Sequence, residues 1–518
     1  MIGFGNEAMA GRAQGARGIS GLWTLLPALV VLLIGGAVQG LTFLNHDVAW
    51  VLNSSERLLH GGTFGQDIVA ANPPLIWWIS ALVAGLAELI GVSPETTLRV
   101  VVLLIAAGVL ALVERALAPR MGHVARAGFL LMLALLVTLG VHRDFAQREH
   151  LAVLLCLPWL LVAARRIEGE DVGPWGAALA GIAAGIGIAF KPHFLAVPAL
   201  VWLCQALKAR SLRPALRIET ATLLITGLAY IGAVWLFARP WLTEVLPLIS
   251  ALYWGFSYPI LAVLQGKIVV IGIVLVALLG AAGGRWPALA SVMAMAGLGF
   301  FIAALAQSKG YSYHFYPALT FALIALMLTV LTDSPRAARL GAGIALGLGL
   351  AFVAAQARPT LTDRSMAGAY GQRTQCLVDL VQAHAAPGEG FMAISTHPDP
   401  GFPTANYSER RWVAETNSRL FLPAIARLRA SAALTPDESR QLELAEATEH
   451  AAMGRDMGQA PAVVLVDARP DRHAIGPLEM DFVAFYREDP AFDRIWSGYT
   501  EIPSCAPGIR AFALNKDR

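Results

Sequence analysis

Charged residues are scarce in this chain of 518 residues: Asp, Glu, Lys and Arg make up 14% of it, whereas hydrophobic residues make up 56%. Because soluble globular proteins average roughly 25% charged residues, this composition excludes an ordinary soluble protein. Apolar runs of about twenty residues recur between residues 22 and 352, which predicts a polytopic, membrane-embedded all-α protein. The net charge of +3 gives no indication of a nucleic acid partner, and we expect none.

Several sequence signatures of enzymes and pumps are also missing. The chain contains no Walker A loop, no paired CxxC, no HExxH and no GxSxG, which argues against a nucleotide-driven pump, a zinc protease and a GxSxG-type serine hydrolase. Channels and transporters typically carry charges in mid-span or break their helices there. Here the charges gather at helix ends on one predicted side of the membrane.

Cysteine is rare, with four residues in the whole chain. Cys156 and Cys204 lie in apolar segments, where we expect unreactive core side chains. Cys376 and Cys505 lie in the polar last third of the chain, and export of that part would allow a disulfide to persist. A bond between them and a pair of free thiols both remain open.

Hydropathy predicts eleven membrane spans. Their centres lie near residues 33, 107, 134, 157, 182, 200, 227, 275, 296, 325 and 347. The first span follows Arg12 and Arg17 and predicts an uncleaved signal anchor with a cytoplasmic N-terminus. Residues 73–90 could form a twelfth span, but the positive-inside rule then fails for nearly all later loops. We therefore predict that residues 73–90 form an interfacial or re-entrant helix.

The distribution of arginine and lysine decides between these two topologies. If residues 73–90 do not cross, the inner loops hold Arg115, Arg120, Arg126, Arg165, Arg166, Lys208, Arg210, Arg213, Arg217, Arg285, Arg336 and Arg339. An odd number of spans then places the rest of the chain on the outer side. We predict a multi-pass protein of the bacterial inner membrane with a periplasmic C-terminal domain.

Composition changes after the last span, which divides the chain into a transmembrane domain of residues 1–356 and a soluble domain of residues 357–518. The soluble part contains strand-like stretches at residues 391–394, 462–466 and 510–514. Helix-like stretches cover residues 372–384, 419–431 and 436–452. This pattern predicts a small α/β domain.

The stretch of residues 45–74, directly after the first span, predicts a short amphipathic helix on the membrane surface. Its apolar face is formed by Val48, Val51, Leu52, Leu58 and Leu59, and Gly61-Gly62 is placed to end it. His46 and Asp47 open the helix. Asp47 either caps the helix or holds a reactive carboxylate at the lipid boundary, and both readings remain open.

A second external loop, residues 142–150, places Asp144, Arg148 and Glu149 directly before an apolar run. Further ionisable groups stand at external helix ends: Lys191 with His193, Arg239, Lys267, and Lys309 with His314. Ionisable groups at membrane depth are costly and are usually functional or paired. The alternative for each cation taken singly is an anchor in the headgroup layer.

This layout resembles the GT-C superfamily of integral-membrane glycosyltransferases, in particular its protein-mannosyltransferase and lipid A aminoarabinose-transferase branch. The resemblance covers roughly residues 20–356 by layout, and matches residue by residue at Asp47, Asn72-Pro73-Pro74 and Glu149. It implies transfer of a sugar from a polyprenyl-phosphate donor to an acceptor on the outer face of the membrane. It also implies that Asp47 is the catalytic base or binds the acceptor, and that Glu149, or else Asp144, is the second carboxylate.

The sequence departs from the family pattern in two places. Val48, not a second acid, follows Asp47, and the second loop lacks Asp-x-Asp. Metal dependence is therefore open: no cofactor is certain, and a divalent cation is an option.

We expect the donor phosphate to be held by cationic side chains, because charge-assisted hydrogen bonds stabilise a leaving phosphate. The candidate donor-phosphate and substrate-binding residues are Lys191, Arg239, Lys267, Lys309, His314, Arg148 and His46. The acceptor can be a lipid, a glycan or a protein.

The alternative functions are a polyprenyl-lipid flippase and an enzyme like the O-antigen ligases, which uses a diphosphate-linked donor. A transferase requires a carboxylate at Asp47 or Glu149 for turnover, whereas a flippase should tolerate the loss of Asp47.

Overall fold

The computed structural model describes residues 5–282, 287–331 and 336–516; Arg285 lies outside these ranges. The chain divides into two compact units. The first unit comprises Met1–Gly40, Leu98–Tyr230 and Pro259–Leu361, and the second comprises Leu41–Thr97, Ile231–Tyr258 and Thr362–Arg518. Two segments from the predicted transmembrane part, residues 41–97 and 231–258, thus group with the C-terminal residues.

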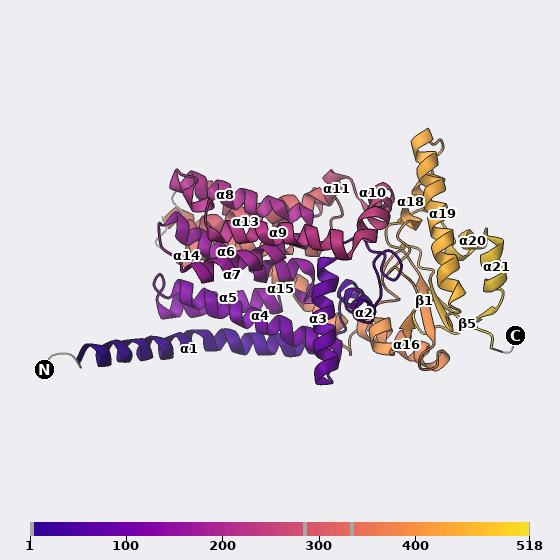
Figure 1. Ribbon diagram of the computed structural model, residues 1–518, viewed down its shortest axis with the longest axis horizontal. Helices are drawn as coiled ribbons and strands as arrows, with labels where there is room; N and C mark the ends of the chain where they lie inside the picture. The colour runs from indigo at the N-terminus through magenta and orange to yellow at the C-terminus, as the bar shows by residue number, and fades with distance from the viewer. Residues whose placement is uncertain (1–4, 283–286, 332–335, 517–518) are drawn as a thin grey trace. The chain divides into compact units, whose positions relative to one another are not determined.

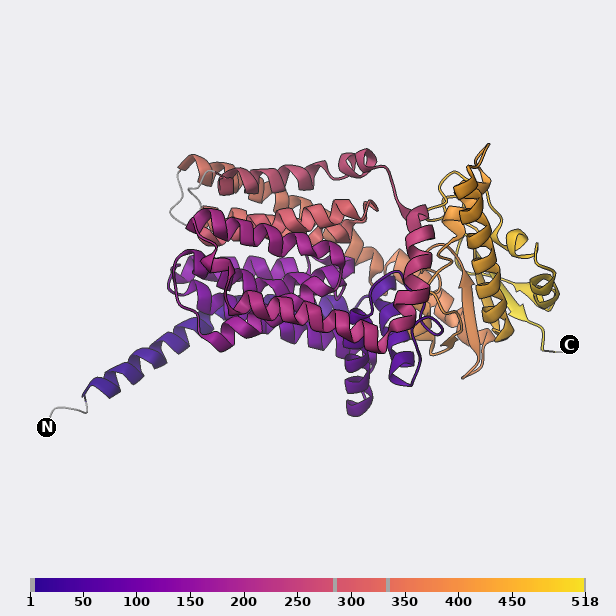
Figure 2. The ribbon, with the colours of Figure 1, turned by 45° about the horizontal axis from the view of Figure 1, so that its top comes forward.

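The first unit is a set of apolar helices that run alongside one another (Figures 1 and 2). They are α1 (Gly5–Gly40), α4 (Pro94–Leu117), α5 (His123–Thr138), α6 (Arg148–Ile167), α7 (Pro174–Ala189), α8 (Ala196–Ala209), α9 (Ile218–Phe237), α11 (Ile260–Gln265), α12 (Ile268–Ala282), α13 (Ala288–Ala306), α14 (Ser312–Leu331) and α15 (Arg336–Arg364). Each of the eleven predicted span centres lies in one of these helices. Within the described residues, seven are long and apolar enough to cross a membrane. The helical membrane character is confirmed, and the number of spans stays a prediction.

Small residues let the helices around α13 approach closely, as is common in membrane proteins. A Cβ atom on Gly297 would lie 3.2 Å from the carbonyl oxygen of Ala318 in α14, and one on Gly299 would lie 2.6 Å from the Cα atom of Val197 in α8. Phe300 of α13 stacks on Phe321 of α14, with ring centroids 5.6 Å apart. This packing holds the starts of α8 and α14 beside the end of α13.

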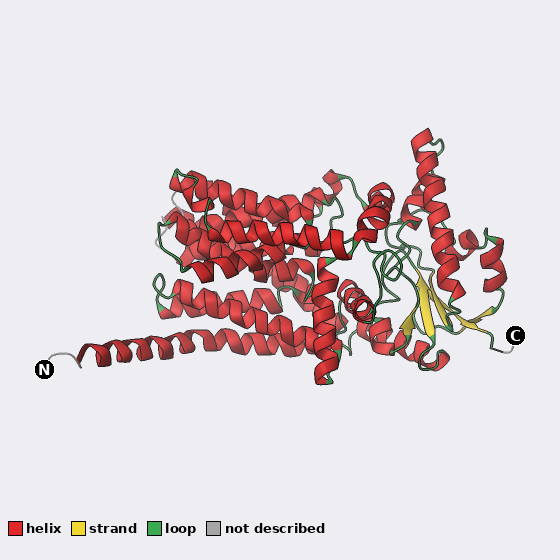
Figure 3. Cartoon of the chain, viewed as in Figure 1, coloured by secondary structure: helices red, strands yellow, loops and turns green. Residues whose placement is uncertain are grey.

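The second unit combines surface helices with a small sheet (Figure 3). Its helices include α2 (His46–Leu59), α3 (Leu75–Ile90), α10 (Leu246–Leu252), α16 (Ala369–His384), α17 (Thr404–Ser408), α18 (Leu422–Arg429), α19 (Pro436–Gly458), α20 (Phe482–Tyr486) and α21 (Pro490–Trp496). The strands are β1 (Gly390–Ile394), β2 (Arg411–Trp412), β3 (Val463–Asp467), β4 (Tyr499–Ile502) and β5 (Ile509–Leu514).

The sheet has the order β2-β1-β3-β5-β4, in which β2, β1 and β3 are parallel and β5 and β4 run antiparallel to their neighbours. Every residue of β1 and β3 is buried, as expected for central strands covered on both faces. One face packs its side chains, such as Met392, Val464 and Phe512, against α18 to α21. The predicted α/β character of this region is present, and its periplasmic location stays a prediction.

Two links tie the unit together. Cys376 in α16 and Cys505 before β5 form a disulfide, which decides between the two readings left open by the sequence. Thr42 pairs with Ser365 in an antiparallel bridge, and the Met366 N–H donates to the Leu41 carbonyl oxygen at 3.1 Å. The chain entering α2 is therefore joined to the chain that leads into α16.

The apolar face of α2 is partly as predicted. Val48, Val51 and Leu52 are buried, and the helix ends before Gly61, whose φ is +93°. Leu59, which we predicted on this face, is instead 40% exposed. It is the last residue of the helix, and its methyl groups lie beside Gly85 of α3, which has no side chain to cover them.

Candidate functional site

A buried polar cluster lies in the first unit around Glu149, the second residue of α6. The Nζ atom of Lys191 donates to Glu149 Oε1 at 2.6 Å and to Gln307 Oε1 at 2.8 Å, and lies 3.1 Å from Nε2 of His314. Glu149, Lys191 and His314 are each 5% exposed or less. The structure thus brings together three of the predicted site residues, and Gln307 completes the set.

Local backbone preferences place these groups. Lys191 precedes Pro192, and a residue before proline is pushed into extended conformation. Its φ of −147° and ψ of 134° end the helical run of α7. Glu149 lies in the first turn of α6, where the helix dipole favours a carboxylate. The cluster therefore forms where several helix ends meet, on α6, α13 and α14 and after α7.

The cluster is incompletely hydrogen-bonded. Among the residues that the structure describes, no partner is found for Nε and Nη1 of Arg148, Oε2 of Glu149, Nδ1 of His314 or Nε2 of His150. Arg148 is 4% exposed. Buried polar groups are normally paired, because each unpaired one is costly. A guanidinium that keeps two donors unused is suited to bind an anionic ligand.

The other predicted residues of this unit are placed around the cluster or beside it. Lys309 and Lys191 both lie close enough to His193 to lower its pKa, although burial is the larger cause. The Nζ atom of Lys267 lies 5.4 Å from the ring centre of Phe315, and burial, followed by the charge of Arg143, lowers the pKa of Lys267.

Asp144 is buried in its own loop, 3.7 Å from Nε of Arg143 and 4.0 Å from Nδ1 of His142. Asp144 lies beside its loop neighbours Arg143 and His142, whereas Glu149 is bonded to Lys191. Of the two carboxylates considered for the second loop, Glu149 is the one in the cluster.

Asp47 lies in the second unit, at the start of α2. The helix is capped by Asn45, whose Oδ1 accepts the N–H of Asp47 at 2.8 Å. The reading of Asp47 as the N-cap is therefore wrong, because the preceding Asn45 fills that position with an equally good capping side chain. The Asp47 side chain is 21% exposed, and its Oδ1 lies 3.9 Å from Nε2 of His46.

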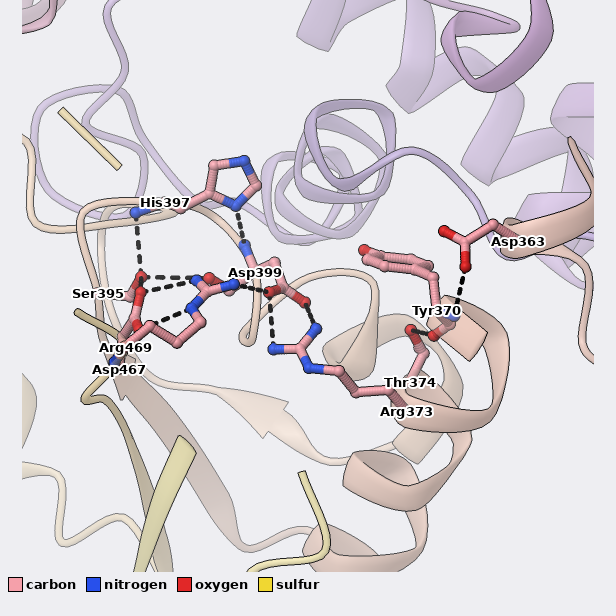
Figure 4. Close-up of polar contacts among 9 residues, drawn as sticks. All are labelled: Asp363, Tyr370, Arg373, Thr374, Ser395, His397, Asp399, Asp467 and Arg469. Atoms are coloured by element: carbon pink, nitrogen blue, oxygen red, sulfur yellow. Dashed lines mark hydrogen bonds and ion pairs between the residues drawn. The ribbon is translucent and has the colours of Figure 1, made fainter. Parts of the chain in front are cut away.

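Three histidine rings lie in contact near Asp47; we call His46, His397 and His473 the histidine cluster. The His46 and His397 ring centroids are 4.4 Å apart, and those of His397 and His473 are 5.1 Å apart. Burial lowers the pKa of His397 well below its usual value, and His46 and His473 lower it further, against the opposing effect of Asp399 and Asp47. The Asp399 N–H donates to Nδ1 of His397 (Figure 4), so the neutral ring carries its proton on Nε2.

A second titratable carboxylate lies on the same helix. Burial, followed by the charges of Glu95 and Glu88, raises the pKa of Glu56 to about 7. Arg57 beside it donates to the carbonyl oxygens of Trp412 and Ala414. The remaining predicted cation, Arg239, is exposed, and its guanidinium lies 5.2 Å from the ring centre of Trp235.

Sequence reasoning missed Gln307, His397 and His473. Gln307 had a signal, because it follows directly on an apolar span. The two histidines are far apart in sequence, and only the fold brings them to His46. No group of three His, Cys, Asp or Glu side chains suited to a metal ion is found within the described ranges.

No family model matches this chain, and no curated protein matches it. Among solved structures, ArnT from Cupriavidus metallidurans bound to undecaprenyl phosphate aligns over 95% of this chain and 98% of its own, with 13% identity and a TM-score of 0.55. The chain has an ArnT-like fold. ArnT in the apo state aligns over 95% and 97%, with 13% identity and a TM-score of 0.53.

Arabinofuranosyltransferase AftD from Mycobacteria aligns over 96% of this chain and 40% of its own, with 15% identity and a TM-score of 0.48. The likeness to ArnT confirms, at the level of the fold, the GT-C resemblance predicted from the sequence. It also extends that resemblance beyond residues 20–356 to nearly the whole chain.

Proposed function

We propose that this protein is a membrane glycosyltransferase that moves a sugar from a polyprenyl-phosphate-linked donor to an acceptor. The observation that carries the proposal is the buried, incompletely hydrogen-bonded cluster of Arg148, Glu149, Lys191 and His314 in a chain with the fold of ArnT. The solved ArnT structure holds undecaprenyl phosphate, which is a polyprenyl phosphate. Such a ligand requires cationic donors at the membrane, and this cluster supplies them.

Arg148 and Lys191 act on the donor phosphate in this proposal. As the bond between the anomeric carbon and the phosphate oxygen breaks, negative charge grows on the phosphate, and donors placed in advance stabilise it. Nε and Nη1 of Arg148, which have no hydrogen-bond partner among the described residues, are available for this purpose. Lys191 is neutralised by Glu149, so its role is to hold the cluster together and to add a donor when the ligand competes with Glu149. Lys267, Lys309 and His314 contribute to the electrostatic environment.

Asp47 is the general base. It accepts the proton of the acceptor hydroxyl while that oxygen bonds to the anomeric carbon, and polyprenyl phosphate leaves with the bonding electron pair. Asn45, not Asp47, supplies the N-cap of α2. Nε2 of His46 lies 3.9 Å from Oδ1 of Asp47 and is placed to exchange a proton with it.

We further propose that the reaction takes place at the periplasmic face of a bacterial inner membrane, with a lipid, glycan or protein acceptor. The N-terminus is then cytoplasmic, residues 357–518 are periplasmic, and residues 73–90 do not cross. A topology reporter fused after Arg210 should be active only in the cytoplasm, and one fused after Arg364 only in the periplasm. The reverse result would contradict both the topology and the location of the site.

The transferase proposal is tested by mass spectrometry of envelope lipids and glycans from a deletion strain. The strain is complemented with the wild type, Asp47→Asn, Glu149→Gln, or the control Asp437→Asn, whose side chain is 70% exposed. We expect one glycan modification to disappear in the deletion strain and with Asp47→Asn, while the polyprenyl-phosphate sugar accumulates. Full modification with both Asp47→Asn and Glu149→Gln would favour a flippase and would contradict the transferase.

A further inference from the structure

Arg364, the last residue of α15, is a buried cation in the second unit. It is 8% exposed, and its guanidinium stacks on the ring of Tyr370 with 4.2 Å between the Cζ atom and the ring centre. No hydrogen-bond partner for its Nη1 atom is found in the part of the chain that the structure describes. A buried charge without an anion nearby is costly, so this position calls for a negatively charged partner.

The hydroxyl of Tyr370 is in the same situation. It is buried, and the described residues offer it no hydrogen-bond partner. The backbone N–H of Tyr370 donates to Oδ1 of Asp363 at 3.2 Å, which fixes the start of α16. Figure 4 shows the hydroxyl at the far end of the ring from Asp363, pointing toward the side where Asp399 lies. Burial, followed by the charge of Asp399, raises the pKa of Tyr370, so the hydroxyl stays a donor.

The other arginines of this region are already paired. Both terminal nitrogens of Arg373 donate to Asp399, at 2.9 and 3.0 Å, and Arg469 donates to both oxygens of Asp467 at 2.9 and 2.7 Å (Figure 4). These ion pairs leave Asp399 and Asp467 committed to other cations. The Nη1 atom of Arg364 and the Tyr370 hydroxyl are therefore adjacent donors without an acceptor among the described residues.

We propose that Arg364 and Tyr370 form a binding site for a phosphate oxyanion. A guanidinium edge suits phosphate oxygens, and a tyrosine hydroxyl adds a third donor. The site lies at the end of α15, a helix long and apolar enough to cross a membrane. When such a helix spans the bilayer, its end lies at the depth of the phospholipid headgroups. The phosphate comes either from a phospholipid headgroup or from a small soluble phosphate. The proposal does not depend on the transferase reaction.

The test uses the full chain purified in a maltoside detergent, which contains no phosphate. Thermal unfolding is followed while inorganic phosphate is added at constant ionic strength, or while phosphatidylglycerol is added as mixed micelles; native mass spectrometry counts retained phosphatidylglycerol. We expect one of the two additions to raise the Tm of the wild type, and which one does so identifies the source.

Arg364→Gln should weaken the apparent affinity about tenfold or more, because charge-assisted hydrogen bonds are lost, and Tyr370→Phe should weaken it less. Arg364→Lys should recover part of the effect. The matched control Arg440→Gln, at an arginine 71% exposed, should bind as the wild type does. Without ligand, Arg364→Gln should unfold at a Tm no lower than the wild type, because it removes a buried charge whose Nη1 atom has no hydrogen-bond partner among the described residues.

Three results would overturn the proposal: no Tm change of the wild type with either addition, equal binding by Arg364→Gln, or a lower ligand-free Tm in Arg364→Gln with binding unaffected in Tyr370→Phe. If Arg364→Gln does not fold, Arg364→Lys and Tyr370→Phe carry the same comparison.

Discussion

Two buried charge clusters in this protein are built in opposite ways. In the second unit, Asp399 accepts two hydrogen bonds from Arg373, and Asp467 accepts two from Arg469. In the first unit, Glu149 is bonded to Lys191 through one oxygen, while its other oxygen and two nitrogens of Arg148 have no partner among the described residues. Completed pairs hold a fold together, whereas donors left over at a buried site indicate a ligand.

The difference is measurable, because the two kinds of cluster respond to substitution through different observables. Loss of a completed pair should appear in the free energy of unfolding. Loss of a donor that has no partner among the described residues, or of a proposed catalytic carboxylate, should appear in turnover or binding, with stability largely kept.

The largest effect is expected for Asp47→Asn. Turnover should fall about 10²–10⁴-fold, because a general base is removed. Thermal unfolding should be nearly unchanged, because Asn45 and not Asp47 caps α2. Transfer assayed with envelope extract as the source of donor and acceptor, alongside Asp437→Asn, checks both. Substantial residual turnover in Asp47→Asn would indicate that Glu149, not Asp47, is the general base.

Asp399→Asn should destabilise the protein by roughly 3–5 kcal/mol, because it breaks a largely buried ion pair and leaves Arg373 without its partner. Equilibrium unfolding of the full chain in detergent measures the change. Turnover per folded molecule should stay close to that of the wild type. A large loss of turnover without a loss of stability would mean that Asp399 takes part in the reaction. It would contradict the view that the ion pair of Asp399 and Arg373 only stabilises the fold.

Arg148→Gln should weaken binding of undecaprenyl phosphate by roughly 1.5–3 kcal/mol, the worth of a charge-assisted hydrogen bond. Lys309→Ala should weaken binding by less, because Lys309 acts on the cluster through its charge, which lowers the pKa of His193 after burial and Lys191. Titration of the lipid in detergent, followed by intrinsic fluorescence, provides the affinities, with Arg440→Gln as control. Unchanged affinity in both variants would contradict the proposal that this cluster binds the donor phosphate.

Glu56→Gln is expected to have the smallest effect, and the size of that effect depends on pH. The folded protein holds the pKa of Glu56 at about 7, against an ordinary value of 4.5, so the folded state binds a proton more tightly than the unfolded state. Its contribution to stability is complete below pH 4.5 and is lost as pH rises through 7.

Unfolding at pH 5 and at pH 8 should therefore show a loss in the wild type that Glu56→Gln reduces. The exposed control Glu443→Gln should retain the slope of the wild type. If the stability of Glu56→Gln changed with pH as much as that of the wild type, the folded state would not raise the pKa of Glu56.

Much of the fold was predictable from local patterns. The strands near residues 391, 463 and 510 are largely apolar runs of five or six residues, and such signals depend on neighbours in sequence. The same holds for α16, α18 and α19. The short strands β2 and β4 were missed, because two to four residues at a sheet edge carry too little periodicity.

The candidate site was predictable only in part. Glu149, Lys191 and His314 were found because charge beside an apolar span is unusual in itself. Gln307 is neutral, and His397 and His473 belong to a polar domain where histidine is ordinary, so only tertiary contacts distinguish them. The cap of α2 shows a further limit: Asn45 and Asp47 are both good caps, and sequence alone does not rank two neighbouring candidates.

The bridge between Thr42 and Ser365 also fixes an order of events during biosynthesis. The two residues of this bridge are roughly 320 residues apart in the sequence. At about 5–20 residues per second, the ribosome needs on the order of 15–65 s to add the second residue after the first. The segment that leads to Asp47 is therefore made long before Ser365, and it cannot form this bridge until the later helices have been synthesised. Early release of the nascent chain before Ser365 should leave that segment open to proteases.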